Sequence, residues 1–132
     1  MKLLRRAVLA LAVLALAACD SSDGSLPTAD ELQGVWVNVD QGTVRAFDFA
    51  ATARTYELYV YQDGSSPIVN QSGSYEVASG RLVTHVNASV DPAIVGQSFG
   101  NDILGFTGSK LTLESGTASN GRRVFTRADA LP

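Results

Sequence analysis

Cysteine and histidine each occur only once in this chain of 132 residues, and these scarcities exclude several kinds of site and fold. Because Cys19 has no second cysteine to pair with, no internal disulfide stabilises the fold, which must depend on burial and hydrogen bonding. His85 has no other histidine or cysteine with which to share a metal ion or to form a catalytic pair. We therefore expect a solvent-facing or rim histidine rather than a site.

Sequence motifs that carry catalysis are also lacking. The serines lie mostly in linkers and turns, with no Gly-x-Ser-x-Gly elbow, and no glycine-rich phosphate loop follows a strand and opens a helix. The carboxylates are spread along the chain, as solubilising residues usually are. The sequence predicts no catalytic residues, no metal and no cofactor, and we do not expect an enzyme.

The one long apolar run lies at the N-terminus, residues 7–18, after the cations Lys2, Arg5 and Arg6. Its twelve residues would span about 18 Å as a helix. A helix that crosses a membrane needs roughly 20 residues. A positive start, a short apolar run and small residues at its end are typical of a secretory signal, which we assign to residues 1–18.

The apolar run ends in Leu16-Ala17-Ala18-Cys19, which resembles the lipobox of bacterial lipoproteins. The resemblance implies that diacylglycerol is attached to the Cys19 sulfur, that residues 1–18 are removed, and that the lipid anchors the protein to a membrane. The expected location is the bacterial cell envelope, on the periplasmic side or the cell surface. An ordinary cleaved signal peptide with an accidental cysteine is the alternative. Asp20 resembles a signal for retention in the inner membrane, or is a solvated linker carboxylate, so which membrane stays open.

Cleavage would leave 132 − 18 = 114 residues and, with three cations lost, would change the net charge from −3 to −6. An acidic domain argues against nucleic acid as a partner and against binding of anionic lipid through a basic patch. Residues 19–27 are polar and small, which predicts a flexible tether. The folded domain is expected to cover residues 28–128.

Helical periodicity is nearly absent from this domain. Thr28 and Glu31 match a capping box, and Gly34 follows, so one short helical turn is expected there. The rest alternates β-rich runs with turn residues, of which Asn120-Gly121 is the clearest hairpin turn. Residues 93–100 are ambiguous between loop, strand and a helical turn. The predicted strands are 35–39, 43–49, 54–62, 68–77, 81–88, 102–106, 111–114 and 122–127.

Seven or eight strands joined by short turns indicate an antiparallel meander. An open sheet of that many strands would twist strongly and expose two edges, and closure into a barrel removes both. The predicted fold is all-β, a small antiparallel up-and-down β-barrel of about eight strands, with a β-sandwich as the alternative.

Gly34 and Trp36 stand on the first strand just after the helical turn, and Arg127 ends the last strand. This combination resembles the lipocalin and lipocalin-like group. The resemblance implies that Trp36 plugs one end of the barrel and that an arginine covers its ring. Arg127 is the first candidate, and Arg122 or Arg123 could serve instead. The chain lacks the C-terminal helix and the disulfides of larger lipocalins, which suits a small bacterial lipocalin-like domain.

Aromatic residues are the remaining candidates for a binding role. In one strand the alternation places Tyr56, Leu58 and Val60 on one face and Glu57, Tyr59 and Tyr61 on the other; in the strand before it, Arg45, Phe47 and Phe49 share a face. Such rings could line a pocket for an apolar ligand, or could simply fill a narrow barrel. The candidates for lining are Phe47, Phe49, Tyr56, Tyr59 and Tyr61.

Two functions follow from these observations. The first is a membrane-anchored barrel that binds a small hydrophobic ligand in the envelope. The second is a structural or protein-interaction lipoprotein whose barrel is filled and whose surface meets an envelope protein. An interior void of roughly 300 Å³ or more would favour the first, and a solid interior would exclude it.

Overall fold

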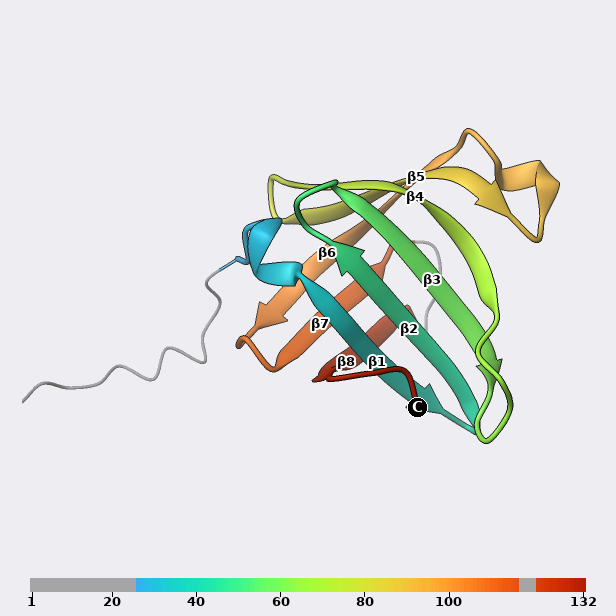
Figure 1. The fold of residues 1–132 in the computed structure, drawn as a ribbon. Coiled ribbons are helices and arrows are strands. Elements are labelled where there is room, and N and C mark those ends of the chain that lie inside the picture. The colour runs from blue at the N-terminus through green and yellow to red at the C-terminus, as the bar shows by residue number, and fades with distance from the viewer. Residues whose placement is uncertain (1–25, 117–120) are drawn as a thin grey trace, which may run out of the picture.

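The computed structural model describes residues 26–116 and 121–132, in which eight strands form one closed antiparallel barrel (Figure 1). Each strand pairs with the next along the chain, and β8 returns to pair with β1. The predicted all-β up-and-down barrel is therefore confirmed over the β-sandwich. The strands are β1 (Gly34–Asp40), β2 (Thr43–Ala50), β3 (Thr55–Gln62), β4 (Val69–Ala78), β5 (Arg81–Ser89), β6 (Ser98–Phe106), β7 (Lys110–Ser115) and β8 (Arg122–Ala128).

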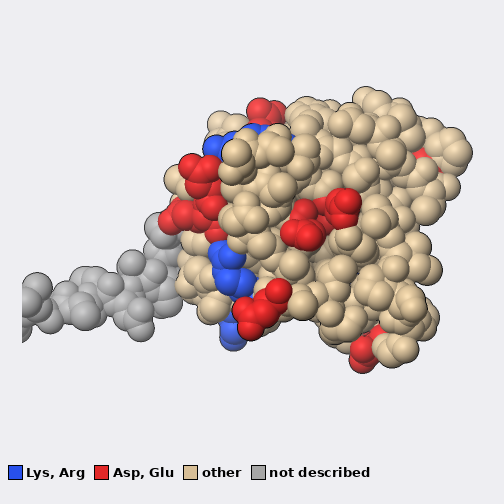
Figure 2. All heavy atoms as spheres, viewed as in Figure 1, with Lys and Arg blue, Asp and Glu red and all other residues tan. Residues whose placement is uncertain are grey.

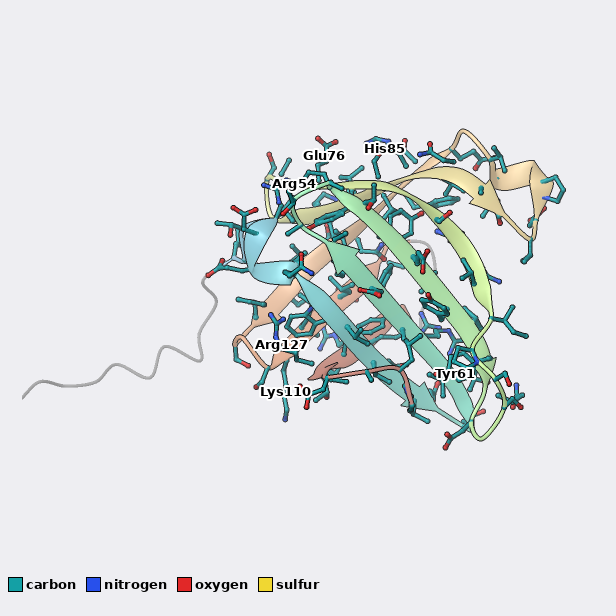
Figure 3. All side chains as sticks on the ribbon, viewed as in Figure 1. Arg54, Tyr61, Glu76, His85, Lys110 and Arg127 are labelled. Atoms are coloured by element: carbon teal, nitrogen blue, oxygen red, sulfur yellow. The ribbon has the colours of Figure 1, made fainter. Side chains whose placement is uncertain are left out.

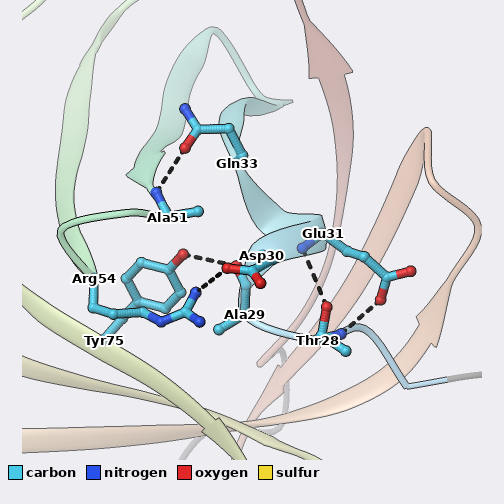
Figure 4. Close-up of polar contacts among 8 residues, drawn as sticks. All are labelled: Thr28, Ala29, Asp30, Glu31, Gln33, Ala51, Arg54 and Tyr75. Atoms are coloured by element: carbon cyan, nitrogen blue, oxygen red, sulfur yellow. Dashed lines mark hydrogen bonds and ion pairs between the residues drawn. The ribbon is translucent and has the colours of Figure 1, made fainter.

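The only helical elements among the described residues are two 3₁₀ turns, η1 (Asp30–Leu32) and η2 (Pro92–Ile94). The expected capping contacts join Thr28 to η1: the Thr28 N–H donates to Glu31 Oε2 at 2.7 Å, and the Glu31 N–H donates to Thr28 Oγ1 at 3.3 Å (Figure 4). The ambiguous stretch 93–100 divides between η2 and the start of β6. The predicted Asn120-Gly121 turn begins outside the described residues.

The barrel has two ends that differ in how they are covered. The floor end carries η1 and the turns that follow β2, β4 and β6, and the mouth end carries the connections that follow β1, β3 and β5 (Figure 1). The chain joins the barrel at the floor end, where Pro27 is buried and the Leu26 side chain lies beside Gly80. Residues 26 and 27, assigned above to the tether, are thus already packed on the barrel.

Apolar side chains fill the floor half of the interior. Alternation along the strands turns every second residue inward, and the bulky ones meet between the sheet walls. Trp36 and Phe49 are completely buried there. This interior cluster comprises Leu32, Trp36, Phe47, Phe49, Tyr56, Tyr75, Leu82, Ile103, Phe106, Leu111, Leu113 and Phe125.

A second, smaller cluster covers the outside of β2 and β3. Val44 and Ala46 alternate with the inward-facing Phe47 and are buried together with Tyr61. The C-terminal segment covers them: Leu131 packs on this cluster and the Tyr61 hydroxyl donates to the Pro132 carbonyl at 2.9 Å. The last residues of the chain therefore pack on the outer wall of the barrel.

Candidate functional site

A cavity of about 250 Å³ occupies the barrel interior between the floor cluster and the mouth end. The interior is therefore not solid, although the volume is below the roughly 300 Å³ at which typical ligand pockets begin. It corresponds to about eight water molecules at roughly 30 Å³ each. Its walls are Arg45, Phe47, Leu58, Val60, Gln71, Thr84, Phe99, Asn101, Leu113, Gly121, Arg123 and Phe125.

Aromatic rings form the base of the cavity. Phe47 packs against Phe125 with ring centroids 5.4 Å apart, and stacks on Phe49 at 5.1 Å with 12° between the planes. Phe47 also meets Tyr56 at 6.1 Å. Because these rings belong to the buried cluster, a ligand in the cavity would rest on a rigid apolar surface.

Neutral polar side chains lie on one wall, and two of them already form hydrogen bonds within the protein. The Gln71 Nε2 group donates to the Tyr56 hydroxyl at 3.0 Å. The Thr84 hydroxyl donates to the Phe99 carbonyl at 3.5 Å, a long contact. Burial raises the pKa of the Tyr56 phenol, so this ring stays neutral at ordinary pH.

Two arginines, Arg45 from β2 and Arg123 from β8, also line the cavity and are partly buried. Across residues 26–116 and 121–132, neither guanidinium has a hydrogen-bond or ion-pair partner. No Asp or Glu of the described chain lines the cavity. The site therefore combines an apolar base with two uncompensated cations.

Three of the five predicted lining aromatics do lie in the interior, and one of them borders the cavity. Phe47 is part of its wall. Phe49 and Tyr56 lie deeper, 0% and 2% exposed, where they belong to the packed floor cluster. The prediction that aromatic rings meet inside the barrel thus describes the base of the cavity more than its walls.

Tyr59 and Tyr61 require a correction, because neither lies in the interior. Both belong to the outer cluster on β2 and β3. The Tyr59 hydroxyl donates to the Glu57 carboxylate, and Tyr61 lies at the C-terminal segment, far from Arg127 (Figure 3). The physical reason is the two-residue period of a strand: Tyr56 faces inward, so the odd-numbered neighbours Glu57, Tyr59 and Tyr61 must face outward.

The residues expected to plug the barrel are brought together at the floor end. Trp36 is fully buried, its indole N–H donates to the Leu32 carbonyl at 2.9 Å, and the Arg127 guanidinium lies 4.2 Å from its ring centroid. Arg127 also donates to the carbonyls of Gly108 at 2.7 Å and Glu31 at 2.7 Å, and to that of Gln33. One side chain therefore ties the end of β8 to η1 and to the β6–β7 turn.

The alternatives to Arg127 have other places. Arg122 lies 4.0 Å from the Glu114 carboxylate, and Arg123 points into the cavity. Gly34 has φ of +109°, and a Cβ there would come within 3.4 Å of Arg127 Nη1. Glycine at this position therefore permits both the backbone turn from η1 into β1 and the close approach of the guanidinium.

His85 faces outward on β5. Its Nδ1 lies 2.5 Å from Ser98 Oγ, and its Nε2 lies 3.3 Å from Glu76 Oε1. In the described ranges no three His, Cys, Asp or Glu side chains are grouped so that they could hold a metal ion. His85, Ser98 and Glu76 thus form a hydrogen-bonded group of three side chains on the surface.

The distribution of charged side chains on the surface differs between the two ends of the barrel. On the face drawn in Figure 2 the Lys and Arg side chains gather at the floor end, whereas acidic side chains also lie along the middle of the face and near the mouth. Two of the floor cations are ion-paired, Arg54 with Asp30 at 2.8 Å and Arg81 with Asp102 at 3.0 Å. Figure 4 shows the first of these pairs beside the Tyr75 hydroxyl, which donates to the Ala29 carbonyl at 2.8 Å.

Sequence reasoning did not identify Arg45 and Arg123 as cavity residues, although a signal for each was present. Arg45 shares its strand face with Phe47 and Phe49, and Arg123 shares a face with Phe125. An arginine that alternates in phase with core aromatics must itself point inward. The alternation along each strand, rather than the residue type, could therefore have predicted that both arginines point into the barrel.

No family model matches this chain, and no curated protein matches its sequence. The fold and the cavity are therefore the features of this chain that bear on its function. The expected lipidation site Cys19, the sorting candidate Asp20 and the leader 1–18 lie outside the described residues. Within the part that the structure describes, no helix is both long enough and apolar enough to cross a membrane.

Proposed function

We propose that this protein is a membrane-anchored lipocalin-like lipoprotein of the bacterial envelope whose barrel binds a small ligand with an apolar body. The observation that carries the proposal is the cavity of about 250 Å³ inside the barrel, with Phe47 and Phe125 at its base. Small-molecule sites are concave and mostly apolar with a few polar groups, which is the composition of these walls. The size favours a compact ligand over a long lipid chain.

The proposed anchor is supported by sequence and by the place where the chain joins the barrel. Leu16-Ala17-Ala18-Cys19 supplies the lipidation motif, and six residues lie between Cys19 and Leu26 at the floor end, which makes seven Cα–Cα steps. Fully extended, this connection reaches at most about 25 Å. The floor end would therefore stay close to the bilayer and the mouth would open toward the aqueous compartment.

Native mass spectrometry of the protein recovered from its own membranes tests the ligand. We expect a co-purifying small molecule on the wild type and none on Val60→Trp, because Val60 lines the cavity and an indole there fills it. Val39→Trp is the matched control, since Val39 is 53% exposed on the outer face of β1. Repeated recovery of ligand-free wild type, or equal loading of both variants, would contradict the proposal.

A surface feature favours a second candidate function, contact with an envelope protein. Ile68, Val69 and Val90 are 57%, 41% and 64% exposed, and Val69 and Val90 line one shallow groove on the adjoining ends of β4 and β5 near the mouth. Grouped exposed apolar side chains often mark a protein contact. Chemical crosslinking in membranes, lost in Val90→Ser but retained in Val39→Ser, would support this function.

A further inference from the structure

The cavity holds two arginines and no carboxylate. Arg45 and Arg123 come from β2 and β8, far apart in sequence, and both line the same space of about 250 Å³. Because both side chains line one cavity of limited volume, a group bound in it has two guanidinium groups in the surrounding walls. The barrel therefore concentrates positive charge at one internal place.

The unpaired cations in the cavity contrast with the ion-paired cations on the outside of the barrel. Acidic side chains outnumber basic ones in the chain, yet the carboxylates that pair with cations do so on the outside, as Asp30 does with Arg54 and Asp102 with Arg81. Arg45 and Arg123 have no such partner in the described chain. The walls of the cavity therefore carry two guanidinium cations and no counter-charge from the described residues.

Two like charges that line the same partly enclosed space repel each other. An interaction between charges is stronger in such a space than in bulk water because the effective dielectric constant is lower. An anion between them would relieve the repulsion and would satisfy donors that the protein leaves unpaired. The charge in the cavity is thus complementary to a ligand of opposite sign.

We infer that the ligand is a small carboxylate with an apolar body: its head group binds Arg45 and Arg123, and its body rests on Phe47 and Phe125. The inference rests on the proposed function and names the chemical class of its ligand. Arginine's planar fork matches the two oxygens of a carboxylate. The volume suits a molecule the size of octanoate, with about ten non-hydrogen atoms.

Isothermal titration calorimetry of the full-length protein in neutral detergent, with protein-free detergent as the blank, tests this inference. The two probes are octanoate and octanamide, which have the same size but differ in charge. We expect octanoate to bind about tenfold more tightly than octanamide or better, since charge-assisted hydrogen bonds exceed neutral ones. Arg45→Gln and Arg123→Gln should each weaken octanoate about tenfold and leave octanamide unchanged.

Lys110→Gln is the matched control because Lys110 has no ion-pair partner among the described residues and lies outside the cavity, at the outer groove beside β8. It removes the same charge and should leave both affinities unchanged. Equal binding of octanoate and octanamide, or octanoate binding that survives both arginine substitutions, overturns the carboxylate inference but leaves an apolar-ligand barrel intact. Binding of neither probe in the millimolar range overturns the proposed function as well. Thermal unfolding of each variant verifies that it is folded.

Discussion

At the scale of single residues, the floor end combines a fully buried ring with a cation over its face. Trp36 contributes apolar bulk to the interior, and Arg127 covers its ring while donating to three backbone carbonyls. A cation over an indole face contributes about 0.5–2 kcal/mol, whereas burial of the ring itself contributes more. Packing therefore dominates this end of the barrel, and the arginine fixes its geometry.

Trp36→Ala should lower the free energy of unfolding by about 3–5 kcal/mol, because it leaves a large void at a completely buried position. Chemical denaturation measures the loss. Leu104→Ala is the control, since Leu104 is 44% exposed and its truncation should change stability by no more than about 0.5 kcal/mol. A loss below about 1 kcal/mol in Trp36→Ala would refute its role as a plug.

Tyrosine ionisation provides a second test at this scale. The hydrogen bond from Tyr59 to the Glu57 carboxylate, together with burial, raises the pKa of Tyr59 to about 12, and burial raises the pKa values of Tyr61 and Tyr75. The unfolded phenol ionises near pH 10. A raised pKa means that the folded state holds the proton more tightly, so this contribution to stability is complete below about pH 10 and is lost as pH rises toward 12.

Ultraviolet absorbance should accordingly show no phenolate in the folded protein until the pH exceeds about 10. Tyr59→Phe should remove the highest of the phenolate steps and weaken the fall in stability between about pH 10 and pH 12. A phenol that ionises at or below the ordinary value while the barrel is still folded would contradict the assigned environments.

At the scale of strands, bulges decide how the sheet curves. The register shifts between Leu58 and Tyr59, between Ser72 and Gly73, and between Ile103 and Gly105. Each shift bends its strand and increases the local twist, which helps a small sheet to close. Two of the three shifts involve a glycine, but the two glycines have different surroundings.

Gly73→Ala should destabilise the barrel by at least about 2 kcal/mol, because a Cβ at this position would lie 1.8 Å from the His85 carbonyl oxygen and would force β5 away. Gly105→Ala is the matched control: its nearest atom is Thr112 Oγ1 at 3.8 Å, an ordinary contact. Thermal and chemical unfolding compare the two. Equal losses in the two variants would show that the close approach of β5 does not determine the cost.

Strand periodicity explains which features could be predicted. Alternation alone located β3 to within one residue of its start, and it placed Tyr59 and Tyr61 opposite Tyr56. Grouping the three tyrosines of this strand as lining residues ignored that phase, which is why the prediction for Tyr59 and Tyr61 needed correction. Bulges could not be predicted, because they arise from contacts between strands that a single run does not contain.

At the scale of the whole molecule, the cavity results from incomplete filling. The floor half is packed by large aromatic residues, whereas Val60, Thr84 and Asn101 near the mouth are too small to meet across the barrel. Its volume depends on side chains from seven strands at once, so no single segment of the sequence could predict it. The presence of Arg45 and Arg123 in the same cavity likewise depends on closure of the barrel.

The proposed attachment of this barrel to a membrane is directly testable on the whole chain. Several acyl chains, at about 0.8 kcal/mol per buried methylene, would hold the protein far more firmly than one chain, so loss of the sulfur proposed to carry the lipid should release it. Cys19→Ser should therefore move the protein from the membrane fraction to the soluble fraction.

Asp20→Ser is the matched control, since it keeps the sulfur and should remain with membranes even if it changes which membrane. Fractionation after a salt wash is the measurement, because salt removes proteins held only by surface charge. The Cys19→Ser protein should still bind octanoate, because the barrel and its arginines lie outside the substituted segment. A Cys19→Ser protein that stays with membranes through the wash would contradict the lipid anchor, and the barrel would then need another means of attachment.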